Sequence, residues 1–175
     1  MEAEKMSLYK YVRENFNSES EQHSEIVRQR LIQWRKEPAT LRIEYPTRLD
    51  RARSVGYRAK PGIILVRQRV PRGGRMKPKI RNGRRPKKYG RKKVVNLSYQ
   101  AVAEQRAQKA FPNLEVLNSY FVGKDGQYYW YEVVLVDRSH PQIIKDPQLS
   151  WIASPKNRNR VKRGLTSAAR RSQMK

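Results

Sequence analysis

The sequence predicts an α+β fold in which helices pack on an antiparallel or mixed sheet, with an extended basic internal loop and a basic C-terminal tail. The predicted elements follow the order helix, helix, strand, strand, helix, hairpin, which is typical of helices packed on one sheet. Apolar residues lie on both faces of the hairpin strands, so we expect both faces of the sheet to be covered. Large aliphatic residues are nearly absent from two basic segments, which therefore cannot form part of the core.

Two helices are predicted at the N-terminal end. Apolar residues between positions 8 and 16 recur at helical spacing, with Ser7 available as a cap. Ser18 and Glu21 have the form of a capping box, which indicates the start of a second helix. Pro38 ends that helix because proline cannot continue the hydrogen-bond ladder. The face of the second helix that we expect to pack inward carries Val27, Leu31 and Trp34.

Two strands flank a short helical segment. The first strand is predicted over residues 41–45 and ends at Pro46. Residues 49–56 favour one or two helical turns that stop at a glycine. Residues 62–66 are β-branched and predict the second strand. The alternation of side chains continues to Arg69, which indicates that the strand extends from the core into solvent or onto a ligand.

A third long helix and a hairpin complete the predicted body. The helix covers residues 98–110 and is closed by Pro112. Two apolar and aromatic runs, 114–122 and 127–137, flank the turn Gly123–Gly126 and give the strongest hairpin signal in the chain. The helix residues expected to face inward are Tyr99, Val102, Ala103, Ala107 and Ala110.

Charge is segregated along the chain. The 175 residues carry a net charge of +25, yet residues 1–50 are neutral and residues 104–146 sum to −1. Residues 51–103 hold 18 basic side chains and residues 147–175 hold eight, with no carboxylate in either stretch. A chain charged in this way repels itself unless it binds a polyanion, so the pattern indicates a polyanionic partner.

The basic segments also divide the chain into a body and extensions. Residues 71–93 contain 12 basic residues, and Ile80 is their only large aliphatic residue. We therefore expect a single body, residues 1–153, interrupted by the extension 71–93 and followed by a second extension, 154–175. Neither extension holds enough apolar surface to offset its ordering entropy, so we expect both to be disordered alone and ordered on a polyanion.

No catalytic or metal-binding constellation is visible. Cysteine is absent, and no serine lies in a glycine-flanked nucleophile elbow or phosphate-binding loop. His23 and His140 are isolated and are expected to have surface roles. Glu132 and Asp137 lie five residues apart on one predicted strand, so they should face opposite sides. We therefore expect no enzymatic activity, no small-molecule substrate and no cofactor.

Membrane association is not expected either. No stretch approaches 18 apolar residues, so the sequence predicts no membrane span. No apolar run follows the first lysines, so no signal peptide is expected.

The basic segments predict nucleic-acid binding. Arginine outnumbers lysine 24 to 16, and its planar guanidinium binds phosphate through two parallel hydrogen bonds. Interleaved glycine and proline keep the backbone extended and close to a phosphate backbone. The stripe Tyr128–Tyr131 is open to two interpretations, base stacking or packing of the hairpin, and packing is favoured because no RNA-binding sheet signature accompanies it. The candidate nucleic-acid-binding residues are Arg51, Arg53, Arg58, Lys60, Arg67, Arg69, Arg72, Arg75, Lys77, Lys79, Arg81, Arg84, Arg85, Lys87, Lys88, Arg91, Lys92, Lys93, Lys156, Arg158, Arg160, Lys162, Arg163, Arg170 and Arg171.

Several blocks of sequence resemble a known family. They are Ser7–Val12, Pro46–Lys60, Phe111–Tyr120 with Val122–Gly123, and Gly164–Ala168. Together they are similar to large-ribosomal-subunit protein fifteen of the archaeal/eukaryotic ("e") type, nearly from end to end. The pairs His140–Pro141 and Trp151–Ile152 favour an archaeal-like member.

The resemblance implies a structural constituent of the large subunit that binds and stabilises folded large-subunit ribosomal RNA (23S class). It also implies neighbouring ribosomal proteins as partners, a cytoplasmic location in ribosomes, and Mg²⁺ ions held by the RNA rather than by the protein. An architectural DNA-binding protein is the alternative interpretation. An RNA-processing enzyme is disfavoured, because such an enzyme needs carboxylates near its basic segments and residues 51–103 contain none.

Overall fold

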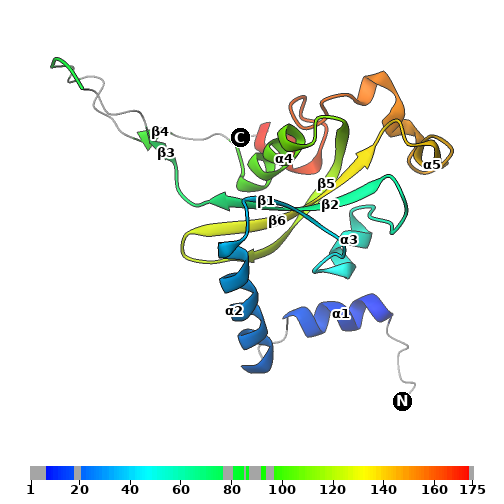
Figure 1. Ribbon diagram of the computed structural model, residues 1–175, viewed down its shortest axis with the longest axis horizontal. Coiled ribbons are helices and arrows are strands. Elements are labelled where there is room, and N and C mark those ends of the chain that lie inside the picture. The colour runs from blue at the N-terminus through cyan, green and yellow to red at the C-terminus, as the bar shows by residue number, and fades with distance from the viewer. Residues whose placement is uncertain are drawn as a thin grey trace.

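The computed structural model describes residues 7–17, 21–76, 81–84, 86, 92–93 and 97–173. Within them lie six α-helices and a four-stranded antiparallel sheet (Figure 1). The sheet has the order β1-β2-β6-β5 and consists of β1 (Thr40–Ile43), β2 (Ile63–Pro71), β5 (Leu114–Lys124) and β6 (Tyr128–Asp137). The helices are α1 (Leu8–Asn17), α2 (Glu21–Lys36), α3 (Leu49–Ser54), α4 (Tyr99–Ala110), α5 (Pro141–Ile144) and α6 (Ser167–Gln173).

Helices cover both faces of the sheet, as the apolar pattern of the hairpin predicts. α4 and α6 lie on one face, and α1, α2 and α3 lie on the other (Figure 1). On the α2 face the rings of Trp34 and Trp130 pack with their centroids 5.9 Å apart. On the α4 face Ala107 packs with Val133 and Leu135, which are completely buried. The core is therefore formed in two layers, one on each side of β2 and β6.

The second helix ends where the local signal places its end. α2 stops two residues before Pro38, and Trp34 faces the core as expected. The Ser18 half of the predicted capping box lies outside the described residues. α1 has no buried residue, and its Arg13 guanidinium lies 3.9 Å from the carboxylate of Asp50 at the start of α3.

α4 has nearly its predicted boundaries, and Tyr99 and Val102 pack inward as expected. The Ser98 hydroxyl accepts a hydrogen bond from the Ala101 backbone N–H and so begins the helix. Ala103 and Ala107 are buried as expected, whereas Ala110 is exposed. The buried positions that the sequence pattern did not indicate are Ala101, Glu104 and Gln108. Two of these, Glu104 and Gln108, have polar side chains. They can be buried because residues distant in the sequence supply their hydrogen-bond partners.

Glu132 is another fully buried carboxylate, on the opposite face of the sheet from α4. It accepts hydrogen bonds from the Tyr120 hydroxyl, at 2.5 Å, and from the hydroxyl and backbone N–H of Thr47. Asp137 instead accepts a bond from the Ser139 backbone N–H. Glu132 and Asp137 thus have separate partners. Burial raises the pKa of Glu132 above its ordinary value, and the bonds from Thr47 and Tyr120 oppose that rise.

The C-terminal segment lies against the body. Two short 3-10 helices, η2 (Ser150–Ala153) and η3 (Pro155–Asn157), lead into α6, and the described residues 154–173 pack against the body. Val161 and Thr166 are almost fully buried. Small side chains and hydrogen bonds between polar groups attach the segment to α4 and β5. The expectation that this segment is disordered without a polyanion stays a prediction.

The internal basic segment leaves the sheet at the end of β2. β3 (Arg75–Met76) and β4 (Lys92–Lys93) pair with each other and lie away from the four-stranded sheet (Figure 1). Two hydrogen bonds attach the base of this segment to the body. The Arg72 backbone N–H donates to the Gln127 carbonyl at 2.8 Å, and the Gly73 N–H donates to the Tyr99 hydroxyl at 2.8 Å.

Candidate nucleic-acid interface

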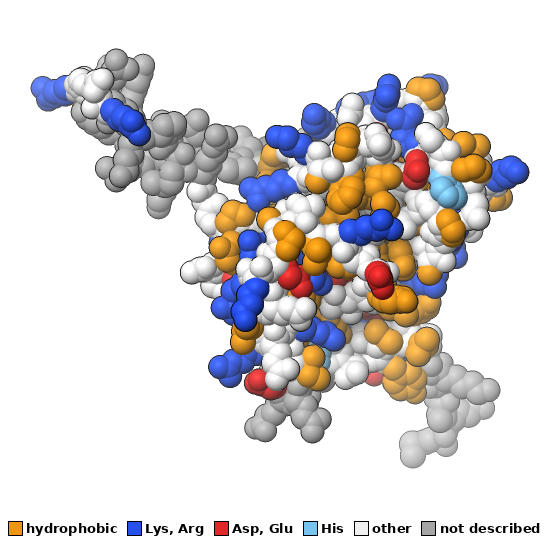
Figure 2. Space-filling view, in the orientation of Figure 1, with side chains coloured by type: hydrophobic (Ala, Val, Ile, Leu, Met, Phe, Trp, Pro, Cys, Tyr) orange, Lys and Arg blue, Asp and Glu red, His pale blue; other side chains and the backbone are white. Residues whose placement is uncertain are grey.

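Twelve of the 25 candidate basic residues have exposed side chains in the described part of the chain. They come from α3, from the base and the far end of the internal segment, and from the C-terminal segment. Figure 2 shows Lys and Arg spread over the visible face, with few carboxylates between them. The exposed candidates are Arg51, Arg53, Arg58, Arg72, Arg81, Arg84, Lys156, Arg158, Lys162, Arg163, Arg170 and Arg171.

Nine candidates have no described side chain. Lys77, Lys79, Arg85, Lys87, Lys88 and Arg91 lie outside the described residues, and for Arg75, Lys92 and Lys93 only the backbone is described. The assignment of these residues to the interface, and the expectation that the internal segment is disordered without RNA, therefore stay predictions.

The charged groups of three candidates form ion pairs or hydrogen bonds with other residues of the fold. Arg67 pairs with Glu37 at 2.5 Å and lies over the Trp34 ring, 4.6 Å from its centroid. Lys60 pairs with Asp146, whose pKa is held below its ordinary value by the hydrogen bond from that ammonium group. Arg160, at the junction of the C-terminal segment with β5, is the third. A run of basic residues in a sequence does not show which of them have partners within the fold and which are available to bind phosphate.

Arg160 connects the C-terminal segment to β5. Its Nε donates to the Val116 carbonyl at 3.2 Å, and its Nη2 donates to the Leu165 carbonyl at 3.2 Å. Desolvation lowers the pKa of the Arg160 guanidinium, and the nearby Glu115 carboxylate opposes that shift. Its side chain thus contributes to packing more than to the interface.

The two arginines at the base of the internal segment lie over aromatic rings. Arg69 lies 4.8 Å from the centroid of Tyr128 and donates to the Arg35 carbonyl at 2.6 Å. Arg72 lies 5.1 Å from the centroid of Tyr129 and donates to the Asp125 carbonyl at 2.8 Å. The ring contact and the hydrogen bond therefore fix the orientation of each guanidinium group. Its other N–H groups remain available as hydrogen-bond donors.

The aromatic stripe of β6 packs within the fold. Trp130 and Tyr131 are buried, and the Tyr129 ring stacks on Tyr99 with centroids 4.9 Å apart and planes at 22°. These contacts support the packing interpretation over base stacking for this stripe.

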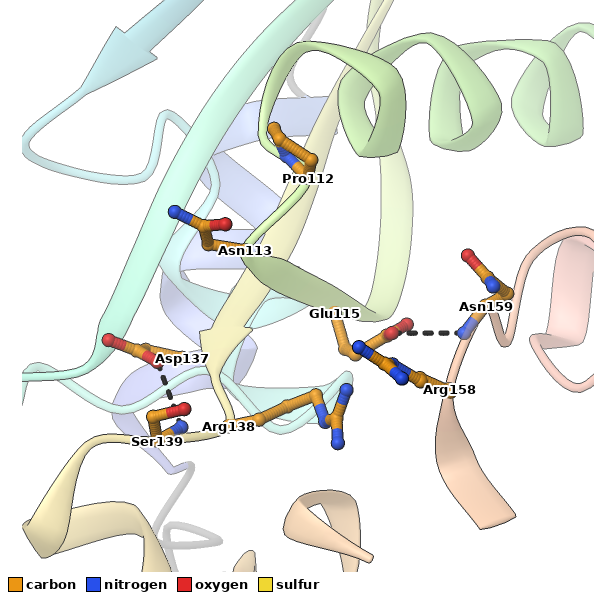
Figure 3. Close-up of a pocket in the computed structure, with 8 residues that line it drawn as sticks. All are labelled: Pro112, Asn113, Glu115, Asp137, Arg138, Ser139, Arg158 and Asn159. Atoms are coloured by element: carbon orange, nitrogen blue, oxygen red, sulfur yellow. Dashed lines mark hydrogen bonds between the residues drawn. The ribbon is translucent and has the colours of Figure 1, made fainter. Parts of the chain in front are cut away.

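A polar cleft of about 630 Å³ lies where β5 begins, β6 ends and the C-terminal segment passes. Figure 3 shows the guanidinium group of Arg158 beside Glu115 and that of Arg138 beyond it on the same side. The Glu115 carboxylate accepts a hydrogen bond from the Asn159 backbone N–H at 2.9 Å. Asn159 has φ 53°, a left-handed conformation that asparagine tolerates better than most residues.

Arg138 is a candidate contact that the charge pattern did not reveal, because it belongs to a stretch with net charge −1. It donates to the Ala153 carbonyl at 3.5 Å, and its buried Nε has no partner among the described residues. The cleft also contains Glu115 and Asp137, so its formal charges cancel. Its mixture of donors and acceptors suits the polar edge of a base or ribose better than a phosphate.

The histidines have local structural roles in the described residues. The His140 Nδ1 accepts a hydrogen bond from the Gln142 backbone N–H at 3.2 Å and so caps α5. The His23 ring packs edge-on against Phe16, with centroids 5.6 Å apart. A search of the described part of the chain finds no cluster of three or more potential metal-ligating side chains. It also finds no helix with the length and apolar character needed to span a membrane.

Comparison with known protein families gives a match over nearly the whole chain. The family model described as Ribosomal L15, of the L15e type, matches residues 7–174. The match includes the internal basic segment and the C-terminal segment as well as the body.

Proposed function

We propose that this chain, which belongs to the ribosomal L15e family, binds large-subunit ribosomal RNA through its exposed arginines and lysines and stabilises the folded RNA. Family membership makes it a non-enzymatic structural protein of the large subunit that serves translation. The proposal adds the RNA contacts, the residues that make them and their physical basis.

The exposed basic side chains without carboxylate partners are the observation that carries the proposal. Residues 51–103 contain no acidic residue, and the described members of this stretch expose arginines from α3 to the base of the internal segment. Each phosphate that such a side chain neutralises releases condensed counterions, which favours binding. Contacts of this kind set the position and register of the protein on RNA.

Packed and exposed arginines have different roles in this proposal. The body, residues 1–153, holds Arg67 in an ion pair, and Arg160 fastens the C-terminal segment to that body. The exposed arginines of α3 and the two basic segments, 71–93 and 154–175, supply the phosphate contacts. RNA strands can then lie close together around the protein, because its basic side chains attract phosphates that would otherwise repel each other. Ribosomal proteins at the edges of the RNA contacts are the second class of partner, and Mg²⁺ ions belong to the RNA.

Sedimentation of a tagged chain in a cell lysate tests the proposal. We expect the parent chain to sediment with the large subunit in low salt and in moderately high salt. A variant with Arg51, Arg53, Arg170 and Arg171 changed to Gln should leave the large-subunit fraction several-fold more easily. The matched control changes four exposed arginines outside the candidate set: Arg28, Arg30, Arg42 and Arg106.

The same experiment separates the alternative, an architectural DNA-binding protein. Release of the parent chain by DNase and not by RNase would support that alternative and contradict RNA binding. Equal loss from the large-subunit fraction in the two four-arginine variants would show that only total charge matters and that the candidate residues are wrong.

A further inference from the structure

A second pocket, of about 280 Å³, lies where α3, β5 and α6 meet the first turn of α4. Its wall includes Arg51 of α3, Phe121 of β5 and Arg171 of α6. These residues are 50 to 120 positions apart in the sequence, so the fold and not a local motif brings them together. No acidic residue lines the pocket.

Phe121 presents an exposed aromatic ring on the edge strand of the sheet. Its side chain is 40% exposed, although most large apolar residues of β5 and β6 are buried. The ring is held from beneath by edge-on contacts with Tyr129 and Tyr131, at centroid distances of 6.3 and 5.9 Å. A rigid ring that remains open on one side is a suitable surface for a nucleobase, because every base has a π-face.

Arg171 is oriented toward this pocket by two hydrogen bonds. Its Nε donates to the Ser167 carbonyl at 3.3 Å, and its Nη2 donates to Oε1 of Gln100 at 3.4 Å. Gln100 is held in turn, because its Nε2 donates to the carbonyl and hydroxyl of Ser119 at 2.9 and 3.0 Å. Two of five guanidinium N–H groups are thus used, and the others have no partner among the described residues.

Arg51 supplies the second positive charge. Its side chain is exposed and makes no hydrogen bond or ion pair with a described residue. Arg48, deeper in the wall, is buried and paired with Asp50 at 3.1 Å, so it adds little net charge. The pocket therefore combines one aromatic face with two guanidinium groups that form no ion pair with a described residue.

We propose that this pocket binds one unpaired nucleotide of RNA, with its base stacked on Phe121 and its phosphates bound by Arg51 and Arg171. The inference rests on the RNA binding proposed above and adds a specific site to it. The nucleotide must be unpaired, because a base within a duplex is already stacked on its neighbours and its face is not available. The stacking contact and the phosphate contacts together select an unpaired nucleotide of the RNA for binding at this edge of the sheet.

Photochemical crosslinking to the full chain tests the site. The probe is a single-stranded RNA of twelve uridines in which 5-iodouridine replaces uridine, and crosslinked peptides are identified by mass spectrometry. We expect a principal adduct at Phe121 and its loss in a duplex of the same iodinated strand with an adenosine strand. An adduct at Phe121 of equal yield with the duplex would overturn the requirement for an unpaired base.

Two matched variants test the role of the arginines. Arg51→Gln with Arg171→Gln should lower the Phe121 adduct several-fold, whereas Arg28→Gln with Arg106→Gln removes the same charge elsewhere and should preserve it. Phe121→Trp should retain crosslinking at position 121, while Tyr45→Ala, at an 81% exposed aromatic, should leave the Phe121 adduct unchanged.

The outcomes separate this site from the general proposal. If the parent chain binds the RNA but crosslinks elsewhere, or if both arginine pairs have the same effect, the pocket inference is wrong and RNA binding stands. If the parent chain binds neither single-stranded nor duplex RNA, the proposed function itself fails and the pocket inference fails with it.

Discussion

The hydroxyl of Thr166 donates a 2.5 Å hydrogen bond to the buried carboxylate of Glu104, across 62 positions of the sequence. The same Thr166 oxygen accepts a bond from the Ala169 backbone N–H and so begins α6. Ser119 donates to the other Glu104 oxygen, also at 2.5 Å. Glu104 therefore joins α4, β5 and the C-terminal segment at one point.

Removing the Thr166 hydroxyl should loosen the C-terminal segment. Thr166→Val keeps the size of the side chain but removes both the bond to Glu104 and the cap of α6. We expect the free energy of unfolding to fall by about 1–3 kcal/mol, the usual cost of leaving a buried polar group without its partner and a helix without its cap. Urea unfolding and hydrogen exchange over residues 167–172 measure the effect. Ser167→Ala, at the adjacent exposed position, is the control, and equal stability of the two variants would contradict the role of Thr166.

Stability should depend on pH through Glu104. Burial raises the pKa of this carboxyl above its ordinary value of 4.5, and the bonds from Ser119 and Thr166 oppose the rise. The folded chain therefore holds this proton to higher pH than the unfolded chain, and the free energy of unfolding falls as pH rises through that interval. Glu104→Gln lacks this dependence.

Urea unfolding of the parent and of Glu104→Gln from pH 4.5 to 7 measures this effect. The stability of the parent relative to the variant should be greatest near pH 4.5 and should decrease toward pH 7. Glu25→Gln, at an exposed position on α2, serves as the control and should follow the parent. A difference between parent and Glu104→Gln that stays constant over the range would show that Glu104 does not titrate as inferred.

The internal basic segment should be needed for assembly and dispensable for folding. Replacing residues 77–91 with a Gly/Ser sequence of equal length removes eight basic side chains and leaves the hydrogen bonds of Arg72 and Gly73 in place. Loop-closure entropy changes slowly with loop length, and the length is unchanged here, so thermal unfolding should match the parent within a few degrees. Recovery in large-subunit particles should fall sharply. Entry of this variant into particles at the parent level would place RNA recognition in the body.

RNA affinity should fall steeply with salt. If about eight phosphates are neutralised, the logarithm of the binding constant should fall with the logarithm of salt concentration at a slope of about −6 to −7, from ~0.7–0.9 per phosphate. Titration of an RNA fragment at several salt concentrations gives the slope. A slope shallower than about −2 is incompatible with charge neutralisation as the main source of affinity.

Elements with local signals were predictable from the sequence. Pro38 and Pro112 end helices, Ser98 begins one, and a hairpin joins β5 to β6 as expected, with its turn at residues 125–127 rather than 123–126. These signals act over a few residues, so a sequence shows them directly. The arrangement of apolar residues on both faces of β6 likewise predicted a sheet that is covered on both sides.

Features that depend on distant partners were not predictable. Glu104 and Gln108 have polar side chains, and only their contacts with Ser119, Thr166 and the backbone of β5 explain why they are buried. The C-terminal segment contains only two large aliphatic residues, Val161 and Leu165, so its packing through such bonds had little signal in composition. Phe121 illustrates the opposite case, an apolar residue in a buried strand whose exposure follows from its place at the sheet edge.

The hydrogen bond from the Gly73 N–H to the Tyr99 hydroxyl has an evolutionary consequence. Because the basic segment departs and returns beside this bond, its two ends are fixed independently of its length. Insertions or deletions between the ends should then accumulate without displacing β2 or α4, so related chains should differ in loop length more than in the two anchoring positions. Gly73 has φ 89°, a conformation that favours glycine, so the anchor should tolerate substitution less well than the residues it encloses.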